Sequence, residues 1–282
     1  MKFCTFDLNG RSCVGVKISG GVVNISAIGF PETINEVIAG GSEMLARISD
    51  VLGANAHSPL CEDDLKFLPV TKPKKIICKG LNYRDHALET GKDAPQHPVF
   101  FSKFNDSLSA HGEPVHLPPW LKKFDHEAEL VIVIGSYAYN VTPENAEAHI
   151  FGYTCGNDLS ARDAQALSSQ WIAGKALPGF APTGPFIVTR DSFDPRESHG
   201  VFCEINGVTA QAGNTTDMIF PCFDIVSAAS LYFPLNPGDL IFTGTPAGVI
   251  MGRKKEDRCW LKPGDVVTVK IDGIGELRTP LV

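Results

Sequence analysis

One stretch of the chain decides how the fold is built. Residues 125–135 read Asp-His-Glu-Ala-Glu-Leu-Val-Ile-Val-Ile-Gly, and residues 130–134 form the longest apolar run of the sequence. A continuous apolar run of this length predicts a strand that is buried on both faces. Side chains alternate along a strand, so Glu127 and Glu129 are predicted on one face, about 7 Å apart. Two such carboxylates repel each other, so they indicate either a bound divalent cation or a solvent-exposed strand start.

Length and composition place the chain among globular proteins. It has 282 residues, of which 43% are hydrophobic and 20% charged, and its net charge is −7. At about 150 residues per domain, this length corresponds to one large domain or two modest ones. The apolar content excludes a disordered chain, and the negative charge argues against nucleic-acid binding, which needs a basic face.

The sequence carries no signal for a membrane or for secretion. No apolar stretch approaches the roughly 18 residues of a membrane span, and no signal or transit peptide is recognised. The eight cysteines form no C-x-x-C pair, so we expect buried thiols rather than disulfides or a zinc site. A cytoplasmic location is therefore predicted, with no membrane partner and no nucleic-acid partner.

Gly and Pro divide the chain into many short elements. A small N-terminal domain is predicted over residues 1–70 and a second domain over residues 71–282, because Pro69 and Pro73 interrupt the pattern there. Strand-like runs do not alternate regularly with helical ones, which predicts a β-rich α+β architecture. Helices are predicted at residues 33–37, 43–52 (ending at Gly53), 83–89, 143–149, 161–171 and 223–231. Strands are predicted at residues 3–8, 12–17, 22–25, 75–78, 130–134, 150–155, 186–189, 201–205, 240–243 and 266–271, with hairpin turns at Asn206-Gly207 and Asp272-Gly273.

A third acidic residue follows the strand-like residues 150–155. Asp158 opens a polar run that leads toward a predicted helix, and by itself it reads as a helix N-cap. Together with Glu127 and Glu129 it completes a set of three carboxylates. Such a set is typical of magnesium or manganese sites that keep positions open for water.

A histidine and a glutamate share one face of a short predicted helix. His86 and Glu89 are three residues apart, so their side chains can touch. A carboxylate beside an imidazole raises its basicity and fixes its tautomer, as a general base requires. The alternative on spacing alone is an ordinary exposed helix pair.

Two further segments are compatible with a binding site. Lys175 precedes a proline-rich loop, although the residues around it, Gly and Ala, by themselves favour a surface lysine. Residues 243–248 are small enough for their backbone N–H groups to approach an anion. The same residues could form a tight turn between strands.

Taken together, these segments resemble the fumarylacetoacetate hydrolase family, in particular its two-domain, acylpyruvase-like and 2-hydroxyhepta-2,4-diene-1,7-dioate isomerase-like members. The resemblance runs from about Lys75 to the C-terminus, with six motifs in the family's order. The matching pieces are residues 80–86, 127–130, 157–163, 170–175, 214–220 and 237–248. The chain departs from the family pattern after Lys175, where Ala176 replaces a common serine and residues 177–180 replace the usual run.

The resemblance implies a fold and a site. The implied fold is a mixed β-sandwich roll with a small N-terminal α/β domain, normally found as a homodimer. The resemblance makes Glu127, Glu129 and Asp158 ligands of Mg²⁺, with Mn²⁺ or Ca²⁺ as alternatives. It makes His86, Glu89 and Lys175 catalytic residues, and Arg162, Gln165 and Thr245 substrate-binding residues.

The implied reaction is hydrolysis of a carbon–carbon bond in a small-molecule 2,4-dioxo acid through a metal-bound enolate. Water activated by His86 would attack the distal carbonyl group, with a 2-oxo acid as one product. Members of one family share a fold and still catalyse different reactions. The alternatives on the same site are oxaloacetate decarboxylation and keto–enol tautomerisation or isomerisation. A relative that binds metal and 2-oxo acid without turnover is a further alternative.

Overall fold

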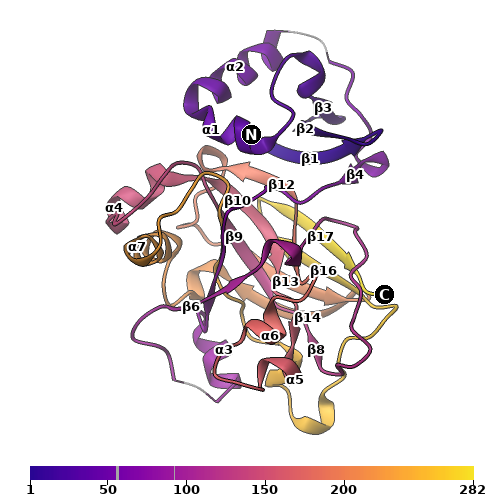
Figure 1. Cartoon of the computed structure of the whole chain (residues 1–282), viewed down its shortest axis with the longest axis vertical. Coiled ribbons are helices and arrows are strands. Elements are labelled where there is room, and N and C mark those ends of the chain that lie inside the picture. Colours follow the sequence, from indigo (N-terminus) through magenta and orange to yellow (C-terminus); the bar gives the residue numbers. More distant parts are fainter. Residues whose placement is uncertain (55–56, 92) are drawn as a thin grey trace.

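Two packed β-sheets form the centre of the molecule (Figure 1). The computed structural model describes residues 1–54, 57–91 and 93–282. The larger sheet has the strand order β3-β2-β1-β12-β10-β9-β15-β5-β6, with β4 beside β1 and β7 beside β12. Its strands are β1 (Lys2–Leu8), β2 (Arg11–Ile18), β3 (Gly21–Asn24), β4 (Lys66–Phe67), β5 (Ile76–Gly80), β6 (Val99–Lys103), β7 (Leu108–Ser109), β9 (Ala128–Ile134), β10 (Ile150–Asn157), β12 (Ala181–Thr189) and β15 (Leu240–Phe242).

A four-stranded antiparallel sheet lies against the larger one, and the helices lie at the two ends and along one side of the pair. Its order is β14-β13-β16-β17, from β13 (Gly200–Ile205), β14 (Val208–Asn214), β16 (Val266–Ile271) and β17 (Gly275–Pro280). A third, two-stranded ladder joins β8 (Phe124–Asp125) to β11 (Ser160–Ala161). The helices are α1 (Ile34–Ala39), α2 (Gly41–Ala54), α3 (Arg84–Glu89), α4 (Pro143–Ala146), α5 (Arg162–Gln165), α6 (Ile172–Lys175) and α7 (Cys222–Tyr232).

Strand β9 lies in the middle of the larger sheet, and every one of its residues is buried. Leu130, Ile132 and Ile134 face the core that is shared with β13 and β16. Val131 and Val133 face a second core on the opposite side of the sheet. Both faces of the strand are therefore covered, which confirms the buried strand predicted from the apolar run.

The N-terminal residues extend the larger sheet. Phe3 of β1 pairs with Ile187 of β12, and β2 and β3 continue the sheet outward. Ile38 of α1 and Ile48 of α2 pack into the core that this part shares with β9. In Figure 1 this part forms the end of the molecule farthest from α3 and α5. The boundary near residue 70 stays a prediction.

Most predicted elements are confirmed, and both hairpin turns form at the predicted dipeptides. Asn206 and Gly207 adopt φ values of 53° and 80° between β13 and β14. Both values lie in the left-handed region of backbone conformation, as a two-residue hairpin turn requires. The turn between β16 and β17 contains Gly273, with φ 80°.

Two helix predictions were wrong. Residues 161–171 do not form one helix, because α5 ends at Gln165 and α6 begins at Ile172. The Ser168 hydroxyl between them bonds to the backbone of Gln170, in competition with helical hydrogen bonds. Gly53 does not end α2, which continues to Ala54. A ring nitrogen of His57 bonds to the carbonyl of Val51 instead, so this helix end needs no left-handed glycine.

Candidate active site

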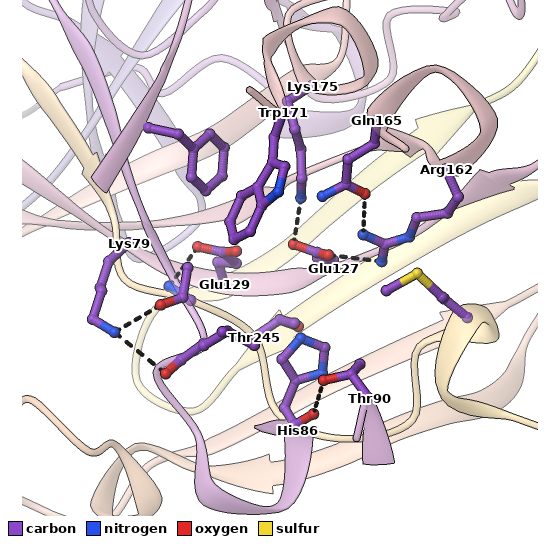
Figure 2. Close-up of a pocket in the computed structure, with 15 residues that line it drawn as sticks. Lys79, His86, Thr90, Glu127, Glu129, Arg162, Gln165, Trp171, Lys175 and Thr245 are labelled. Atoms are coloured by element: carbon purple, nitrogen blue, oxygen red, sulfur yellow. Dashed lines mark hydrogen bonds and ion pairs between the residues drawn. The ribbon is translucent and has the colours of Figure 1, made fainter. Parts of the chain in front are cut away.

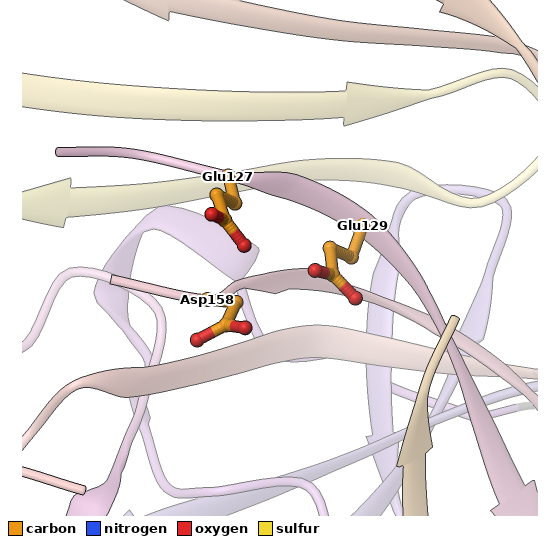
Figure 3. A group of neighbouring side chains, drawn as sticks. All are labelled: Glu127, Glu129 and Asp158. Atoms are coloured by element: carbon orange, nitrogen blue, oxygen red, sulfur yellow. The ribbon is translucent and has the colours of Figure 1, made fainter. Parts of the chain in front are cut away.

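Three carboxylates meet at one edge of the larger sheet, where β9 begins and the neighbouring β10 ends (Figure 3). Glu129 lies in β9, opposite Gly156 of β10, and Glu127 precedes β9. The backbone N–H of Asp158 donates to the carbonyl of Glu127 over 2.9 Å, which brings Asp158 beside the two glutamates. One ligand atom from each of the three lies within 4.8 Å of the others. All three residues are buried, which excludes the alternative of an exposed strand start. Asp158 is also not a helix N-cap, since Ala161 is the residue before α5.

Three buried cations neutralise two of these carboxylates. The Lys175 ammonium lies 2.7 Å from Glu127 Oε2 and 2.8 Å from Asp158 Oδ2. The Arg162 guanidinium contacts Glu127 Oε1 over 2.7 Å, and Lys103 Nζ lies 2.7 Å from Asp158 Oδ1. Lys175 is 2% exposed, which excludes the surface lysine that its sequence context allows.

The charges around Glu127 set its protonation state. Burial by itself would raise the pKa of the Glu127 carboxyl, but the nearby Lys175 and Arg162 cations lower it below its usual range. Burial favours neutral Lys175, whereas the carboxylates of Asp158 and Glu127 raise the pKa of its ammonium. Glu127 and Lys175 are therefore an ion pair at neutral pH.

Glu129 differs from its two neighbours. It accepts one hydrogen bond, from the backbone N–H of Gly244 over 2.7 Å. Among the described residues, no cationic side chain lies within ion-pair distance of it. Burial, together with the charges of Asp158 and Glu127, raises the pKa of the Glu129 carboxyl well above its usual range. The cluster thus holds one carboxylate whose charge the protein leaves uncompensated.

This imbalance fits a divalent metal ion. Three carboxylates supply hard oxygen ligands, which Mg²⁺ and Mn²⁺ prefer. Asp158 Oδ1 is buried and accepts no well-aligned hydrogen bond, although it is close to Lys103. An ion among Glu127, Glu129 and Asp158 would neutralise Glu129 and use this free acceptor.

Arg162 is held from two sides. Asp125, which is fully buried, accepts from Arg162 Nε over 2.8 Å and also from the backbone N–H groups of Ile250 and Met251. Gln165 Oε1 accepts from Arg162 Nη1 over 3.0 Å. This bond leaves the Gln165 NH₂ group free to donate elsewhere.

The opposite wall of the site is α3, which carries His86 (Figure 2). His86 Nδ1 lies 2.8 Å from Glu89 Oε1, and Glu89 Oε2 accepts from the backbone N–H of Gly248 over 2.9 Å. A carboxylate only accepts hydrogen bonds, so Nδ1 carries the proton and Nε2 is the basic atom. His86 is 6% exposed and its ring points toward the carboxylates, so the exposed helix pair is excluded.

These groups surround a small cavity of about 40 Å³. Seven predicted site residues line it: His86, Glu127, Glu129, Arg162, Gln165, Lys175 and Thr245. Asp158 and Glu89 lie behind this lining and contact it through Lys175 and His86. The structure thus brings all nine predicted site residues together.

The loop after β15 uses its polar groups within the protein. Thr245 Oγ1 donates to the carbonyl of Ala128 and accepts from Gln211 Nε2. Its hydroxyl proton is therefore already engaged, and Gly244 gives its N–H to Glu129. The N–H approach to an anion that was predicted for residues 243–248 occurs, and the anion is a side chain of the protein.

Sequence reasoning missed two buried lysines. Lys103, at the end of β6, donates to the carbonyls of Leu159, Phe180 and Lys175 and pairs with Asp158. Lys79, at the end of β5, lines the cavity. The available signal was the strand period, because Lys79 shares a face with the buried Ile77.

Comparison with known proteins agrees with this geometry. Residues 75–282 match the model of the fumarylacetoacetate hydrolase C-terminal family. The chain belongs to this family. It is 37% identical to a mitochondrial oxaloacetate tautomerase of Xenopus laevis over 93% of this chain and 83% of the relative. Because its relatives are tautomerases, hydrolases and isomerases, the chain is an enzyme of this family.

Solved structures show the same fold along the whole chain. A fumarylacetoacetate hydrolase from Exiguobacterium antarcticum superposes with a TM-score of 0.88 at 35% identity, covering 100% of this chain and 99% of that one. A maleylpyruvate hydrolase from Sphingobium, solved with manganese and pyruvate, gives 0.81 at 27% identity, with the same coverage. These likenesses confirm the predicted fold, and the manganese of the Sphingobium structure supports a divalent-metal site in this family. Among the described residues, no helix is long and apolar enough to cross a membrane.

Proposed function

We propose that this chain catalyses the keto–enol interconversion of oxaloacetate or a closely similar 2-oxo acid. The observation that carries the proposal is the position of one base, the His86 ring, across a small cavity from the carboxylates. The small volume of this cavity, about 40 Å³, favours a small acid over a bulky substrate. The oxaloacetate tautomerase activity of the relative from Xenopus laevis supports this choice of substrate.

Glu127, Glu129 and Asp158 would hold the metal ion. When bound, a divalent ion supplies a Lewis acid that draws electrons from the 2-oxo group. We propose Mg²⁺ as the natural ion, with Mn²⁺ or Ca²⁺ as alternatives. Three carboxylates leave coordination positions for water and substrate, which favours Mg²⁺ or Mn²⁺ over the larger, more highly coordinated Ca²⁺.

The protein's own groups then move one proton. His86 Nε2 takes a proton from C3 of the substrate, and the electrons of that C–H bond form the C2–C3 double bond. The Lys175 ammonium donates a hydrogen bond to the negative charge that develops on the 2-oxo oxygen. The His86 imidazolium, stabilised by Glu89, returns the proton to that oxygen and completes the enol. Arg162, Gln165 and the loop of Thr245 would position the carboxylate of the substrate.

The test is the rate at which enolic oxaloacetate relaxes to the keto form, followed by its ultraviolet absorbance. We expect acceleration that depends on Mg²⁺ or Mn²⁺ and disappears in Glu129→Gln. The exposed Glu144→Gln variant is the matched control and should keep the full rate. No acceleration by metal-loaded wild-type protein would overturn the tautomerase proposal.

Hydrolysis of a 2,4-dioxo acid, the reaction expected first from the sequence, is the second candidate. His86 Nε2 could instead deprotonate a water molecule for attack on a distal carbonyl. The maleylpyruvate hydrolase relative supports this reaction. Formation of pyruvate and acetate from acetylpyruvate would establish it. Release of carbon dioxide from oxaloacetate would identify a decarboxylase, and metal-dependent binding without any product would identify a non-catalytic relative.

The remaining expectations concern assembly and location. We propose a homodimer that acts on a small-molecule acid in the cytoplasm. The Xenopus laevis relative is described as mitochondrial, so the mitochondrion is the alternative location. Sedimentation equilibrium of the full chain measures the oligomeric state. Cell fractionation distinguishes the two locations.

A further inference from the structure

One buried lysine of the cavity has no role in the reaction described above. Lys79 lies at the end of β5, is 1% exposed and lines the cavity. Figure 2 shows it on the Glu129 side, across the carboxylates from Lys175 and Arg162. The cavity therefore has a cationic group on the side opposite Lys175 and Arg162.

The partners of Lys79 are all uncharged. Its ammonium donates to the carbonyls of Gly80 over 2.7 Å and Leu81 over 3.3 Å, and it lies 4.7 Å from the centre of the Phe220 ring. Within the described part of the chain, no carboxylate comes within ion-pair distance of it. The buried lysines 103 and 175, in contrast, each contact an acidic side chain.

A buried ammonium without a counter-ion is unfavourable in the free protein. Burial lowers the pKa of Lys79 to about 8, against the opposing effect of the Glu129 charge. The group is therefore mainly protonated at neutral pH. Two of its three N–H donors bond to carbonyls, which leaves one donor for another acceptor.

The backbone that positions this ammonium is itself strained. Leu81 adopts φ 57°, in the left-handed region that residues with a Cβ rarely occupy. Its carbonyl is one of the two that bind Lys79. Strain of this kind persists where a site needs it, and here the strained turn holds the lysine at the cavity wall.

We propose that Lys79 binds the second carboxylate of a dicarboxylic 2-oxo acid. The inference rests on the proposed function, in which the 2-oxo end of the substrate lies beside Glu127, Glu129 and Asp158. The other end of a short dicarboxylate would then reach the Glu129 side, where Lys79 has an unused donor and no counter-ion. Lys79 thus sets specificity, favouring dicarboxylic over monocarboxylic 2-oxo acids.

The test compares two ligands that differ only at that end. Oxaloacetate carries a carboxylate where 2-oxobutyrate carries a methyl group. We would measure the dissociation constant of each from the Mn²⁺-loaded protein by calorimetry, with kcat and KM for oxaloacetate alongside. A charged hydrogen bond corresponds to roughly tenfold to hundredfold in affinity, so we expect wild-type protein to prefer oxaloacetate by that factor.

The variants are Lys79→Met, Lys79→Gln and, as a matched control on the exposed surface, Lys72→Met. We expect both Lys79 variants to lose the preference through weaker oxaloacetate binding, with 2-oxobutyrate affinity unchanged. Lys79→Met should also melt at the same or a higher temperature, because it removes an uncompensated charge. If Lys79→Met does not fold, Lys79→Gln, which keeps donors for the two carbonyls, decides the matter.

The outcomes that would contradict the role of Lys79 differ from the one that would contradict the proposed function. If both ligands weaken equally in the Lys79 variants, or if only Mn²⁺ affinity changes, Lys79 balances the charge of Glu129 and the inference is wrong. If wild-type protein shows no preference between the ligands, the inference is also wrong. If metal-loaded wild-type protein binds neither ligand, the proposed function fails and the inference fails with it.

Discussion

The carboxylate cluster and helix α3 form opposite walls of one cavity, and they are built in different ways. The cluster residues lie on or beside adjacent strands in the middle of the larger sheet. Helix α3 has only six residues, and the Glu89 side chain ties it to the loop after β15. The carboxylate cluster sets the charge of the site, and α3 sets the orientation of the His86 ring. Their contributions to catalysis should therefore be separable.

The largest effect is expected from removing a cluster carboxylate. Asp158→Asn should abolish metal binding measured by calorimetry and lower activity by about 10³-fold or more, because Lewis-acid stabilisation is worth several kcal/mol. The exposed Glu144→Gln variant is the control. Wild-type metal affinity in Asp158→Asn would contradict the assignment of this residue as a ligand.

His86→Gln should separate the two walls. We expect kcat to fall by about 10² to 10⁴-fold, the usual contribution of a general base. The Mn²⁺ affinity should stay unchanged, because His86 is outside the ligand set. A parallel loss of metal binding would show that the walls are not independent.

A glycine behind α3 offers a finer test. A Cβ added to Gly252 would lie 2.5 Å from the Glu89 carboxyl group, so Gly252→Ala should displace Glu89 and turn the His86 ring. Misplacement by about 1 Å can cost up to 10²-fold in rate. Gly53→Ala, where added atoms meet nothing within 4 Å, is the matched control. Full activity in Gly252→Ala would mean that the reaction rate does not depend on the position of the Glu89 side chain.

The smallest effect concerns the pH dependence of stability. Lys79 has a pKa of about 8 in the folded chain, against an ordinary value of 10.5. Between these values the unfolded chain binds more protons, so the free energy of unfolding should rise with pH across this window. From pH 7.5 to 9.5, the free energy of unfolding measured in urea should rise by roughly 1–2 kcal/mol more in the wild-type protein than in Lys79→Met. Identical pH dependence in the two proteins would contradict the shifted pKa.

The sequence predicted the cluster better than its surroundings, for physical reasons. Glu127 and Glu129 adjoin an apolar run whose period places them on one face, and the family motifs located Asp158. The ion pair of Lys103 with Asp158 joins the end of β6 to the residue after β10, and no local pattern reports such a contact. The Ser168 hydroxyl competes with helical hydrogen bonds between α5 and α6, and helical periodicity does not reveal this competition. Lys79 was missed because its neighbours indicate a core strand.

The most direct measurement of the central claim is hydrogen exchange at C3 of a 2-oxo acid. Every reaction considered for this cavity withdraws electrons into the 2-oxo group, and tautomerisation requires His86 to remove the C3 proton. With saturating 2-oxobutyrate in D₂O, the account predicts Mg²⁺- or Mn²⁺-dependent deuterium incorporation by NMR, absent in His86→Gln. Exchange no faster than in buffer, from wild-type protein that binds both metal and 2-oxobutyrate, would contradict it.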